Sequence, residues 1–162
     1  MKNLRVGNGI DVHPFKKERK LILCGELIEY DYGLDGHSDA DVATHAIIDS
    51  LLGASGLGDI GTHFPDSSAE YKDISSLLLL RRVKEMIEKA GFDVVNVDLT
   101  IVAQAPKLSG YISEMRRNIA SILEVDQGMV SIKATTTNGL GFIGKGEGIA
   151  AFATCLLREK NG

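Results

Sequence analysis

The sequence predicts an α+β protein in which a mixed β-sheet carries helices packed on one face. Segments with helical spacing and segments rich in Val and Ile follow one another without the regular alternation of a doubly wound nucleotide-binding fold. The 162 residues are 44% apolar and 25% charged, as in an ordinary globular protein. No linker, internal repeat or low-complexity tract interrupts the chain, so we expect residues 1–162 to form one domain.

The N-terminal part predicts two short strands and a helix. Residues 4–12 and 21–24 are apolar segments, and the charged turn at residues 14–20 suggests that they pair as a hairpin. Apolar residues then recur at helical spacing over residues 39–52, and Gly53 is placed to end this helix.

The middle of the chain predicts two helices with a strand between them. Residues 74–90 repeat the helical pattern, and Gly91 stops it. Residues 94–103 are rich in Val and Ile and indicate a largely buried strand. Helical spacing returns over residues 108–123.

Two further strands, residues 130–136 and 149–157, flank a glycine-rich loop. Residues 133–138 offer hydroxyls, an amide and a cation suited to phosphate oxygens. Residues 139–144 spell G-x-G-x-x-G, but that fingerprint opens a helix in dinucleotide-binding proteins, and here a strand-like run follows. We reject the dinucleotide interpretation. The alternative to phosphate binding is a long hairpin whose glycines only satisfy positive φ.

Charge and cysteine content exclude several classes of partner. A net charge of -4 gives no general attraction to nucleic acid.

No apolar run approaches the roughly 20 residues that span a bilayer, and the N-terminus lacks the apolar stretch of a signal peptide. Cys24 and Cys155 stand far apart, which indicates reduced thiols and a cytoplasmic protein. The single basic run is interpreted as a solvated loop and comprises Lys16, Lys17, Arg19 and Lys20.

Asp11, His13 and His45 are the candidate metal ligands. A spacing of two residues on a strand sends Asp11 and His13 to the same face, and His45 adds a second imidazole. This is a common zinc set that leaves a fourth position for substrate or water, and manganese or iron are alternatives. Alone, D-x-H is a weak pattern, since either residue can cap a turn or hydrogen-bond at a strand end.

The segment 37–45 contains two of the four histidines. On a helix Asp41, His45 and Asp49 share one face, so a carboxylate is expected to orient the His45 ring. The other interpretation of Asp39 and Asp41 is a favourable interaction with the helix dipole. His63 is explained by a surface loop and is not a candidate ligand.

Motifs along nearly the whole chain closely resemble the 2-C-methyl-D-erythritol 2,4-cyclodiphosphate synthase family. They are D-V-H at 11–13, H-S-D-A-D-V-A-T-H at 37–45, G-D-I-G at 58–61, F-P-D at 64–66, A-Q-A-P-K at 103–107 and K-A-T-T-T at 133–137. The resemblance implies an enzyme of the non-mevalonate isoprenoid pathway that converts 4-diphosphocytidyl-2-C-methyl-D-erythritol 2-phosphate into the cyclic diphosphate and releases CMP.

The resemblance also implies roles for individual residues. Asp11, His13 and His45 match the zinc ligands, and His37 and Thr136 match the pair that stabilises the transition state. A homotrimer is implied, with each site shared between neighbouring subunits. The implied substrate contacts, which include the cytidine and phosphate pocket, are Asp11, Val12, His13, His37, Ser38, Asp59, Ile60, Gly61, Phe64, Pro65, Asp66, Ser67, Ser68, Ala103, Gln104, Ala105, Pro106, Lys107, Leu108, Ser109, Ala134, Thr135, Thr136, Thr137, Asn138, Phe142 and Lys145.

Two positions depart from the family pattern. Asn138 stands where many relatives have a glutamate that reaches a second ion, Mg²⁺ or Mn²⁺, on the substrate diphosphate. Lys145 stands where an arginine is frequent, which keeps the charge without the bidentate geometry.

Two rival functions stay open at this point. In a metal-dependent phosphohydrolase, zinc-bound water would be the nucleophile and inorganic phosphate the product. In a non-catalytic binding protein for an isoprenoid or nucleotide, the metal would be purely structural, and a closed four-ligand site is expected.

Overall fold

A computed structural model describes residues 3–160 of the chain. A five-stranded sheet has the strand order β4-β1-β7-β5-β6, and β2 and β3 form a separate pair. The strands are β1 (Leu4–Lys17), β2 (Leu21–Leu23), β3 (Glu26–Ile28), β4 (Tyr32–Leu34), β5 (Phe92–Val102), β6 (Val130–Thr135) and β7 (Gly148–Glu159).

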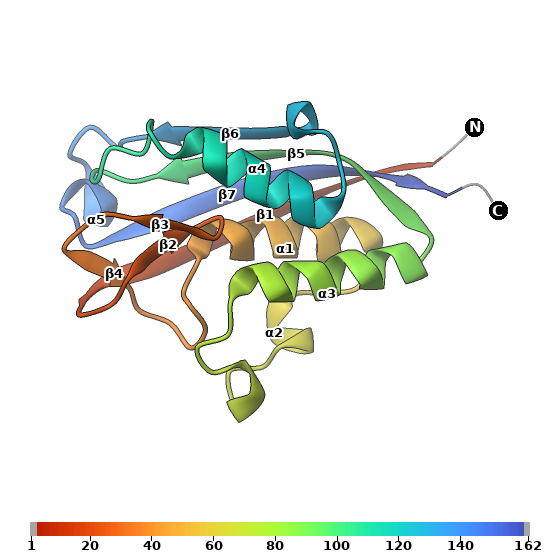
Figure 1. Cartoon of the computed structure of the whole chain (residues 1–162), viewed down its shortest axis with the longest axis horizontal. Helices are drawn as coiled ribbons and strands as arrows, with labels where there is room; N and C mark the ends of the chain where they lie inside the picture. Colours follow the sequence, from red (N-terminus) through yellow and green to blue (C-terminus); the bar gives the residue numbers. More distant parts are fainter. Residues whose placement is uncertain (1–2, 161–162) are drawn as a thin grey trace.

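Helices α1, α3 and α4 lie on one face of this sheet (Figure 1). In Figure 1, α1 lies directly beneath the sheet and α3 packs on the side of α1 away from it. The helices are α1 (Val42–Ser55), α2 (Ile60–His63), α3 (Ser76–Lys89), α4 (Ile112–Leu123) and α5 (Gly141–Gly144), with single 3₁₀ turns at η1 (Ala69–Tyr71) and η2 (Gln127–Met129).

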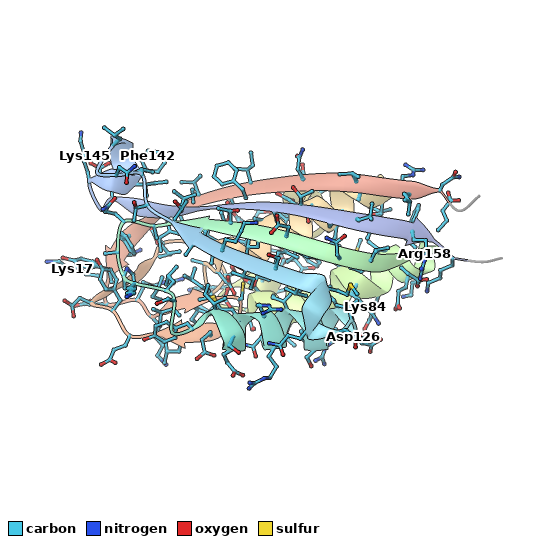
Figure 2. The ribbon with its side chains drawn as sticks, turned by 90° about the horizontal axis from the view of Figure 1, so that it is seen from above. Lys17, Lys84, Asp126, Phe142, Lys145 and Arg158 are labelled. Atoms are coloured by element: carbon cyan, nitrogen blue, oxygen red, sulfur yellow. The ribbon has the colours of Figure 1, made fainter. Side chains whose placement is uncertain are left out.

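The sheet is mixed, as predicted. β7 pairs antiparallel with both β1 and β5, whereas β5 and β6 run parallel. Figure 2 views the sheet from its other side, where no helix covers β1, β7, β5 and β6. Exposed apolar side chains lie on this open face, including Val6, Ile10, Val12 and Phe152.

The predicted hairpin between residues 4–12 and 21–24 is wrong. β1 continues through Pro14 to Lys17, where it pairs antiparallel with β4, and Leu21–Leu23 pairs instead with Glu26–Ile28. The turn of that second pair is Cys24-Gly25, and both residues have positive φ, as a type I′ hairpin turn requires. The charged residues after Pro14 indicated a turn because this end of β1 lies beside solvent.

Other element boundaries differ by a few residues. The helix predicted over 39–52 begins at Val42, because Asp41 is its N-cap, and ends at Ser55 before Gly56 in the left-handed conformation. The helix predicted over 108–123 begins only at Ile112. The glycine-rich loop contains the short helix α5, which the sequence pattern did not predict.

Close contact between β1 and α1 depends on two glycines. A Cβ on Gly7 would lie 2.0 Å from the carbonyl oxygen of Ser50, and one on Gly9 would lie 2.1 Å from that of Ala46. Only residues without a side chain fit there, so the strand backbone rests directly on the helix backbone. This contact sets the distance between the strand that carries Asp11 and the helix that carries His45. No helix within residues 3–160 is long and apolar enough to cross a membrane.

Candidate metal centre and adjoining pockets

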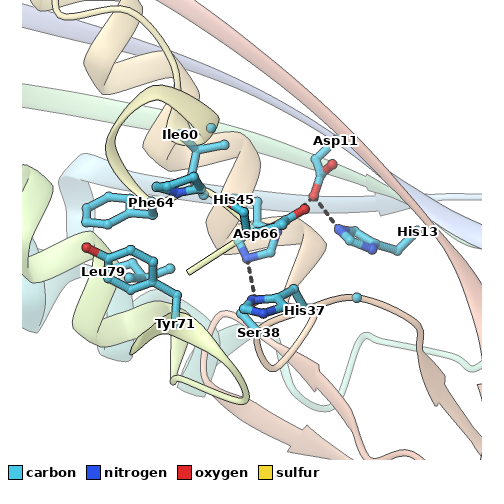
Figure 3. A pocket seen from close by; sticks show the side chains of 14 residues that line it. Asp11, His13, His37, Ser38, His45, Ile60, Phe64, Asp66, Tyr71 and Leu79 are labelled. Atoms are coloured by element: carbon cyan, nitrogen blue, oxygen red, sulfur yellow. Dashed lines mark hydrogen bonds and ion pairs between the residues drawn. The ribbon is translucent and has the colours of Figure 1, made fainter. Parts of the chain in front are cut away.

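Asp11, His13 and His45 come together beneath the sheet (Figure 3). Asp11 and His13 point from β1 toward α1, and His45 points up from the first turn of α1. The Asp11 Oδ2 atom lies 2.9 Å from His13 Nε2 and 3.0 Å from His45 Nδ1. One ligand atom from each residue lies within 4.8 Å of the other two, so a single small cation fits between them.

Each imidazole is anchored through the nitrogen that faces away from Asp11. His13 Nδ1 lies 2.5 Å from the carbonyl oxygen of Asp35, and the N–H of that nitrogen donates to it. His45 Nε2 lies 2.9 Å from Ser76 Oγ and 3.1 Å from Ser38 Oγ. The opposite nitrogens, His13 Nε2 and His45 Nδ1, face the Asp11 carboxylate and are the ring atoms placed to bind a shared cation.

The electrostatics of the cluster favour a cation. Burial of the Asp11 carboxylate acts to raise its pKa, but hydrogen bonds with His13 and His45 outweigh burial and hold the pKa well below the usual range. Burial acts to lower the pKa of His13, yet the hydrogen bond and charge of Asp11 raise it overall. Two imidazoles and a carboxylate supply the ligand types that zinc prefers, and a fourth position stays open toward a pocket.

The expectation that Asp41 or Asp49 orients the His45 ring is wrong. The Asp41 carboxylate is fully buried and accepts from the backbone N–H groups of Cys24, Gly25 and Thr44 and from the Thr44 hydroxyl. Asp49 accepts from the backbone N–H of Ile60, 2.8 Å away. Helical spacing placed these carboxylates near His45, but each of them binds backbone groups of neighbouring segments.

A pocket of about 370 Å³ opens beside the metal cluster. It gathers the metal candidates with predicted substrate contacts from three segments, and Figure 3 shows Asp66 near the cluster and Phe64 and Tyr71 farther along the wall. The sequence did not identify Tyr71 and Leu79, since core packing explains such residues equally well. The predicted contacts that line the pocket are Asp11, His13, His37, Ser38, Ile60, Gly61, Phe64, Pro65, Asp66 and Ser67.

A second pocket, of about 410 Å³, lies where β5 and β6 end. Because the two strands are parallel, the segments that follow them meet at the same edge of the sheet. Ile112 at the start of α4 completes the wall and was not predicted. The predicted contacts that line this pocket are Ala103, Gln104, Ala105, Pro106, Lys107, Leu108, Ser109, Ala134, Thr135 and Thr136.

His37 and Thr136, the predicted catalytic pair, do not share a pocket within one chain. His37 lines the pocket beside the metal cluster, Thr136 lines the pocket at the ends of β5 and β6, and the two pockets have no residue in common.

Other predicted substrate contacts lie outside both pockets. Val12 is on the open face of the sheet. The Asp59 carboxylate caps α2 by accepting from Thr62, and the Ser68 hydroxyl accepts from the backbone N–H of Glu70. The rest belong to the glycine-rich segment after β6, which holds Thr137, Asn138, Phe142 and Lys145.

Asn138 adopts a left-handed backbone conformation, with φ of 54°. Asn accepts this conformation more readily than most residues. The turn is closed by contacts of the Thr136 hydroxyl with the backbone N–H and side-chain oxygen of Asn138. Gln104 joins this loop to the second pocket by accepting from the backbone N–H of Gly139 at 3.2 Å.

Arg19 is a residue whose role the sequence did not suggest. Its guanidinium donates to the carbonyl oxygens of Leu34, Gly36 and Ser38, at 3.2, 3.3 and 2.9 Å, and lies 3.6 Å from the Asp73 carboxylate. It therefore organises residues 34–38, the segment that carries His37 and the carbonyl that anchors His13. The interpretation of Lys16, Lys17, Arg19 and Lys20 as a solvated run fails for this one member.

The fold and the site define an α+β protein with a candidate divalent-metal centre in a half-open pocket. The family model described as the YgbB family matches residues 4–158. The chain belongs to the YgbB family. A 2-C-methyl-D-erythritol 2,4-cyclodiphosphate synthase from Pelodictyon phaeoclathratiforme is 54% identical over 156 residues, covering 96% of this chain and 99% of that relative. The synthase from Clostridium botulinum is 56% identical over 154 residues, covering 95% and 99%.

Solved structures agree with this assignment. The bifunctional IspDF from Campylobacter jejuni matches with a TM-score of 0.96 and 40% identity, over 99% of this chain and 44% of that longer chain. A CDP complex of IspF from Plasmodium falciparum matches with a TM-score of 0.86 and 37% identity, over 99% of both chains. The family resemblance predicted from the motifs is confirmed.

Proposed function

We propose that this protein is a 2-C-methyl-D-erythritol 2,4-cyclodiphosphate synthase of the non-mevalonate isoprenoid pathway. It converts 4-diphosphocytidyl-2-C-methyl-D-erythritol 2-phosphate into the cyclic diphosphate and releases CMP. The observation that carries the proposal is the cluster of Asp11, His13 and His45, open to a pocket of about 370 Å³ in a chain whose relatives at 54% and 56% identity are such synthases.

The reaction needs no nucleophile from the protein. An oxygen of the 2-phosphate attacks the β-phosphorus, and the bond between this phosphorus and the oxygen bridging to CMP breaks. Positioning of the two phosphates and neutralisation of their charge therefore account for the rate. A zinc ion held by Asp11, His13 and His45 would supply Lewis-acid polarisation of the diphosphate.

His37 and Thr136 are proposed to donate hydrogen bonds to the phosphoryl oxygens as charge develops on them. The residues from Ala103 to Ser109 and from Ala134 to Thr136 are proposed to bind the cytidine and its phosphates. The position of this second pocket at the ends of two parallel strands supports the assignment. The CDP named in complexes of two structural relatives supports a cytidine nucleotide as the ligand.

We infer that the protein is a homotrimer whose sites are completed between subunits. The proposed catalytic residues His37 and Thr136 line separate pockets of one chain, which supports this inference. In the trimer, a neighbouring copy would supply the missing half. The open face of the sheet supports self-association, because Val6 and Ile10 there are 70% and 58% exposed.

A second ion, Mg²⁺ or Mn²⁺, is proposed to bind the substrate diphosphate near Asn138. An amide offers a carbonyl oxygen but no charge, so the ion relies more on the phosphates and on water than it does beside a glutamate. The buried thiols Cys24 and Cys155 support a reducing environment, and we place the protein in the cytoplasm.

Mass spectrometry of the products decides between this function and its rivals. Purified protein is incubated with the cytidyl substrate, Zn²⁺ and Mg²⁺, and the expected products are CMP and the cyclic diphosphate in equal amounts. Inorganic phosphate without the cyclic product would identify a phosphohydrolase instead. Unchanged substrate, with binding detected by calorimetry, would identify a non-catalytic binding protein.

A further inference from the structure

A chain of hydrogen bonds reaches His45 from the side opposite Asp11. Ser76, the first residue of α3, is fully buried, and its Oγ atom lies 2.9 Å from His45 Nε2. The Asp39 carboxylate holds Ser76 twice. Its Oδ1 atom accepts from the Ser76 hydroxyl, and its Oδ2 atom accepts from the Ser76 backbone N–H at 2.8 Å.

The Asp39 carboxylate determines which group donates each hydrogen bond in this series. Serine has one hydroxyl proton, and the hydrogen bond to the Asp39 carboxylate uses it. Ser76 Oγ therefore faces His45 with a lone pair, and His45 Nε2 must be the nitrogen that carries the proton. Nδ1, 3.0 Å from the Asp11 carboxylate, is then the remaining ring nitrogen and the one that a metal ion would bind.

Ser38 does not determine this direction. Its hydroxyl lies 3.1 Å from His45 Nε2 and also accepts from the backbone N–H of Ala40 at 3.3 Å. No carboxylate fixes its proton, so the hydroxyl accommodates either form of the imidazole.

We propose that Asp39 and Ser76 are positioning residues that select Nδ1 of His45 as the metal-binding atom. This inference deepens the proposed function and rests on the same metal centre. A cation binds only the unprotonated nitrogen, so a ring with its proton on Nδ1 must first exchange it before metal enters. Asp39 and Ser76 thus keep the His45 proton on Nε2, and neither residue contacts the substrate or the metal.

A purely structural reading of the same contacts is that Asp39 fixes the start of α3. Ser76→Ala separates the two readings, because it removes the hydroxyl but keeps the backbone N–H that Asp39 accepts. Ser75→Ala is the matched control. Ser75 precedes Ser76 at the same helix start, and its side chain makes no capping hydrogen bond.

Zinc affinity is the first readout, measured for each variant by competition with a chelating dye. We expect Ser76→Ala to weaken zinc binding roughly 10- to 100-fold, the range for loss of a group that orients a metal-bound histidine. Ser75→Ala should bind zinc like the natural protein. Equal affinities for Ser76→Ala and Ser75→Ala would overturn the proposal.

Asp39→Asn tests the direction of the chain with a side chain of the same shape. An amide has one acceptor where the carboxylate has two, so its NH₂ group must face either the Ser76 hydroxyl or the Ser76 N–H. The first arrangement turns the serine proton toward His45, and the second breaks the contact with α3. We expect a loss of zinc affinity at least as large as that of Ser76→Ala, and natural affinity in this variant would contradict the proposal.

The second readout is the ¹⁵N spectrum of the His45 ring in zinc-loaded protein. Zinc on Nδ1 and a proton on Nε2 are expected, and zinc on Nε2 would refute the assignment whatever the affinities are. Neither measurement uses the cytidyl substrate. If the protein lacks the proposed synthase activity, the zinc measurements can still be interpreted. If the enzyme is active and Ser76→Ala has unchanged zinc affinity, only this inference is refuted.

Discussion

Gly9 of β1 lies against Ala46 of α1 so closely that a Cβ on Gly9 would fall 2.1 Å from the Ala46 carbonyl oxygen. Since Ala46 follows His45 and Gly9 precedes Asp11 by two residues, this contact connects backbone packing with the geometry of the metal centre. A wider separation of strand and helix would draw Asp11 and His45 apart.

Gly9→Ala is therefore expected to destabilise the fold by about 1–3 kcal/mol, the usual cost of overpacking. It should also weaken zinc binding, because α1 must move away from β1. Urea unfolding and a zinc titration measure the two effects. The control is Gly53→Ala in the same helix, where the nearest atom to a new Cβ is 3.9 Å away. That change is expected to be neutral or stabilising, and equal losses in both variants would contradict the packing argument.

His45→Ala should abolish zinc binding at stoichiometric concentrations, because two ligands and solvent rarely hold zinc against dilution. Elemental analysis of the purified variant measures this. His63→Ala is the matched control, since the His63 ring contacts the carbonyl oxygen of Leu57 and lies outside the cluster. One zinc per chain in His45→Ala would show that His45 is not a ligand.

Shared sites predict complementation between two inactive variants. His45→Ala damages the pocket beside the metal cluster, and Thr136→Ala damages the pocket at the ends of β5 and β6. In mixed trimers, about one site in four combines two intact halves, so roughly a quarter of the natural activity should return. Light scattering of the natural protein should give the mass of three chains. No recovery in trimers shown to be mixed would place both halves of each site in one chain.

Asn138→Glu should lower the Mg²⁺ concentration needed for half-maximal activity and leave the zinc content unchanged. The added carboxylate supplies the charge that a hard cation prefers. Asn138→Gln is the control, because it has the size of Glu without its charge and suffers the same strain at a φ of 54°. Overlapping magnesium curves for the Glu and Gln variants would show that residue 138 has no part in metal binding.

Arg19→Ala should loosen residues 34–38 and cost about 1.5–3 kcal/mol, the range for a hydrogen bond to a charged group. Arg19→Lys should restore only part of the loss, because an ammonium group cannot reach three carbonyls as the guanidinium fork does. Thermal unfolding measures both, with the exposed Lys17→Ala as control. A change in Arg19→Ala no larger than in Lys17→Ala would show that the guanidinium contacts contribute little.

The parts of the fold that the sequence predicted are those with strong periodic patterns. α3, β5, β6 and β7 lie within a few residues of their predicted bounds, because each buries one regular face or a continuous apolar run. The extension of β1 and its pairing with β4 depend on tertiary contacts rather than on local preference. Pro14 and the charged residues after it favour a turn by their local conformational preferences, and the sequence alone does not show the tertiary contacts that extend the strand.

The metal candidates were predictable for a similar reason. Asp11 and His13 share a strand face by their spacing alone, and the motif containing His45 is dense in polar residues. The groups that anchor the rings were not predictable. Ser76 lies 31 residues after His45 and reaches it only because α3 packs beside α1. Asp41 and Asp49 had the right spacing, but a spacing argument does not reveal which backbone groups compete for a carboxylate.

The two histidines of the metal centre differ in whether a mutation can remove the group that holds each ring in place. The anchors of His45 are side chains, Ser76 with its partner Asp39 and also Ser38, so each of them is lost when its own residue is substituted. The anchor of His13 is the main-chain carbonyl of residue 35, which any amino acid supplies. Substitutions at Asp35 should therefore leave the hydrogen bond of His13 in place. At positions 39 and 76, few other amino acids should be accepted. The two histidines therefore differ in how far their surroundings can change in sequence. In a deep mutational scan, most substitutions should be tolerated at residue 35 and few at residues 39 and 76.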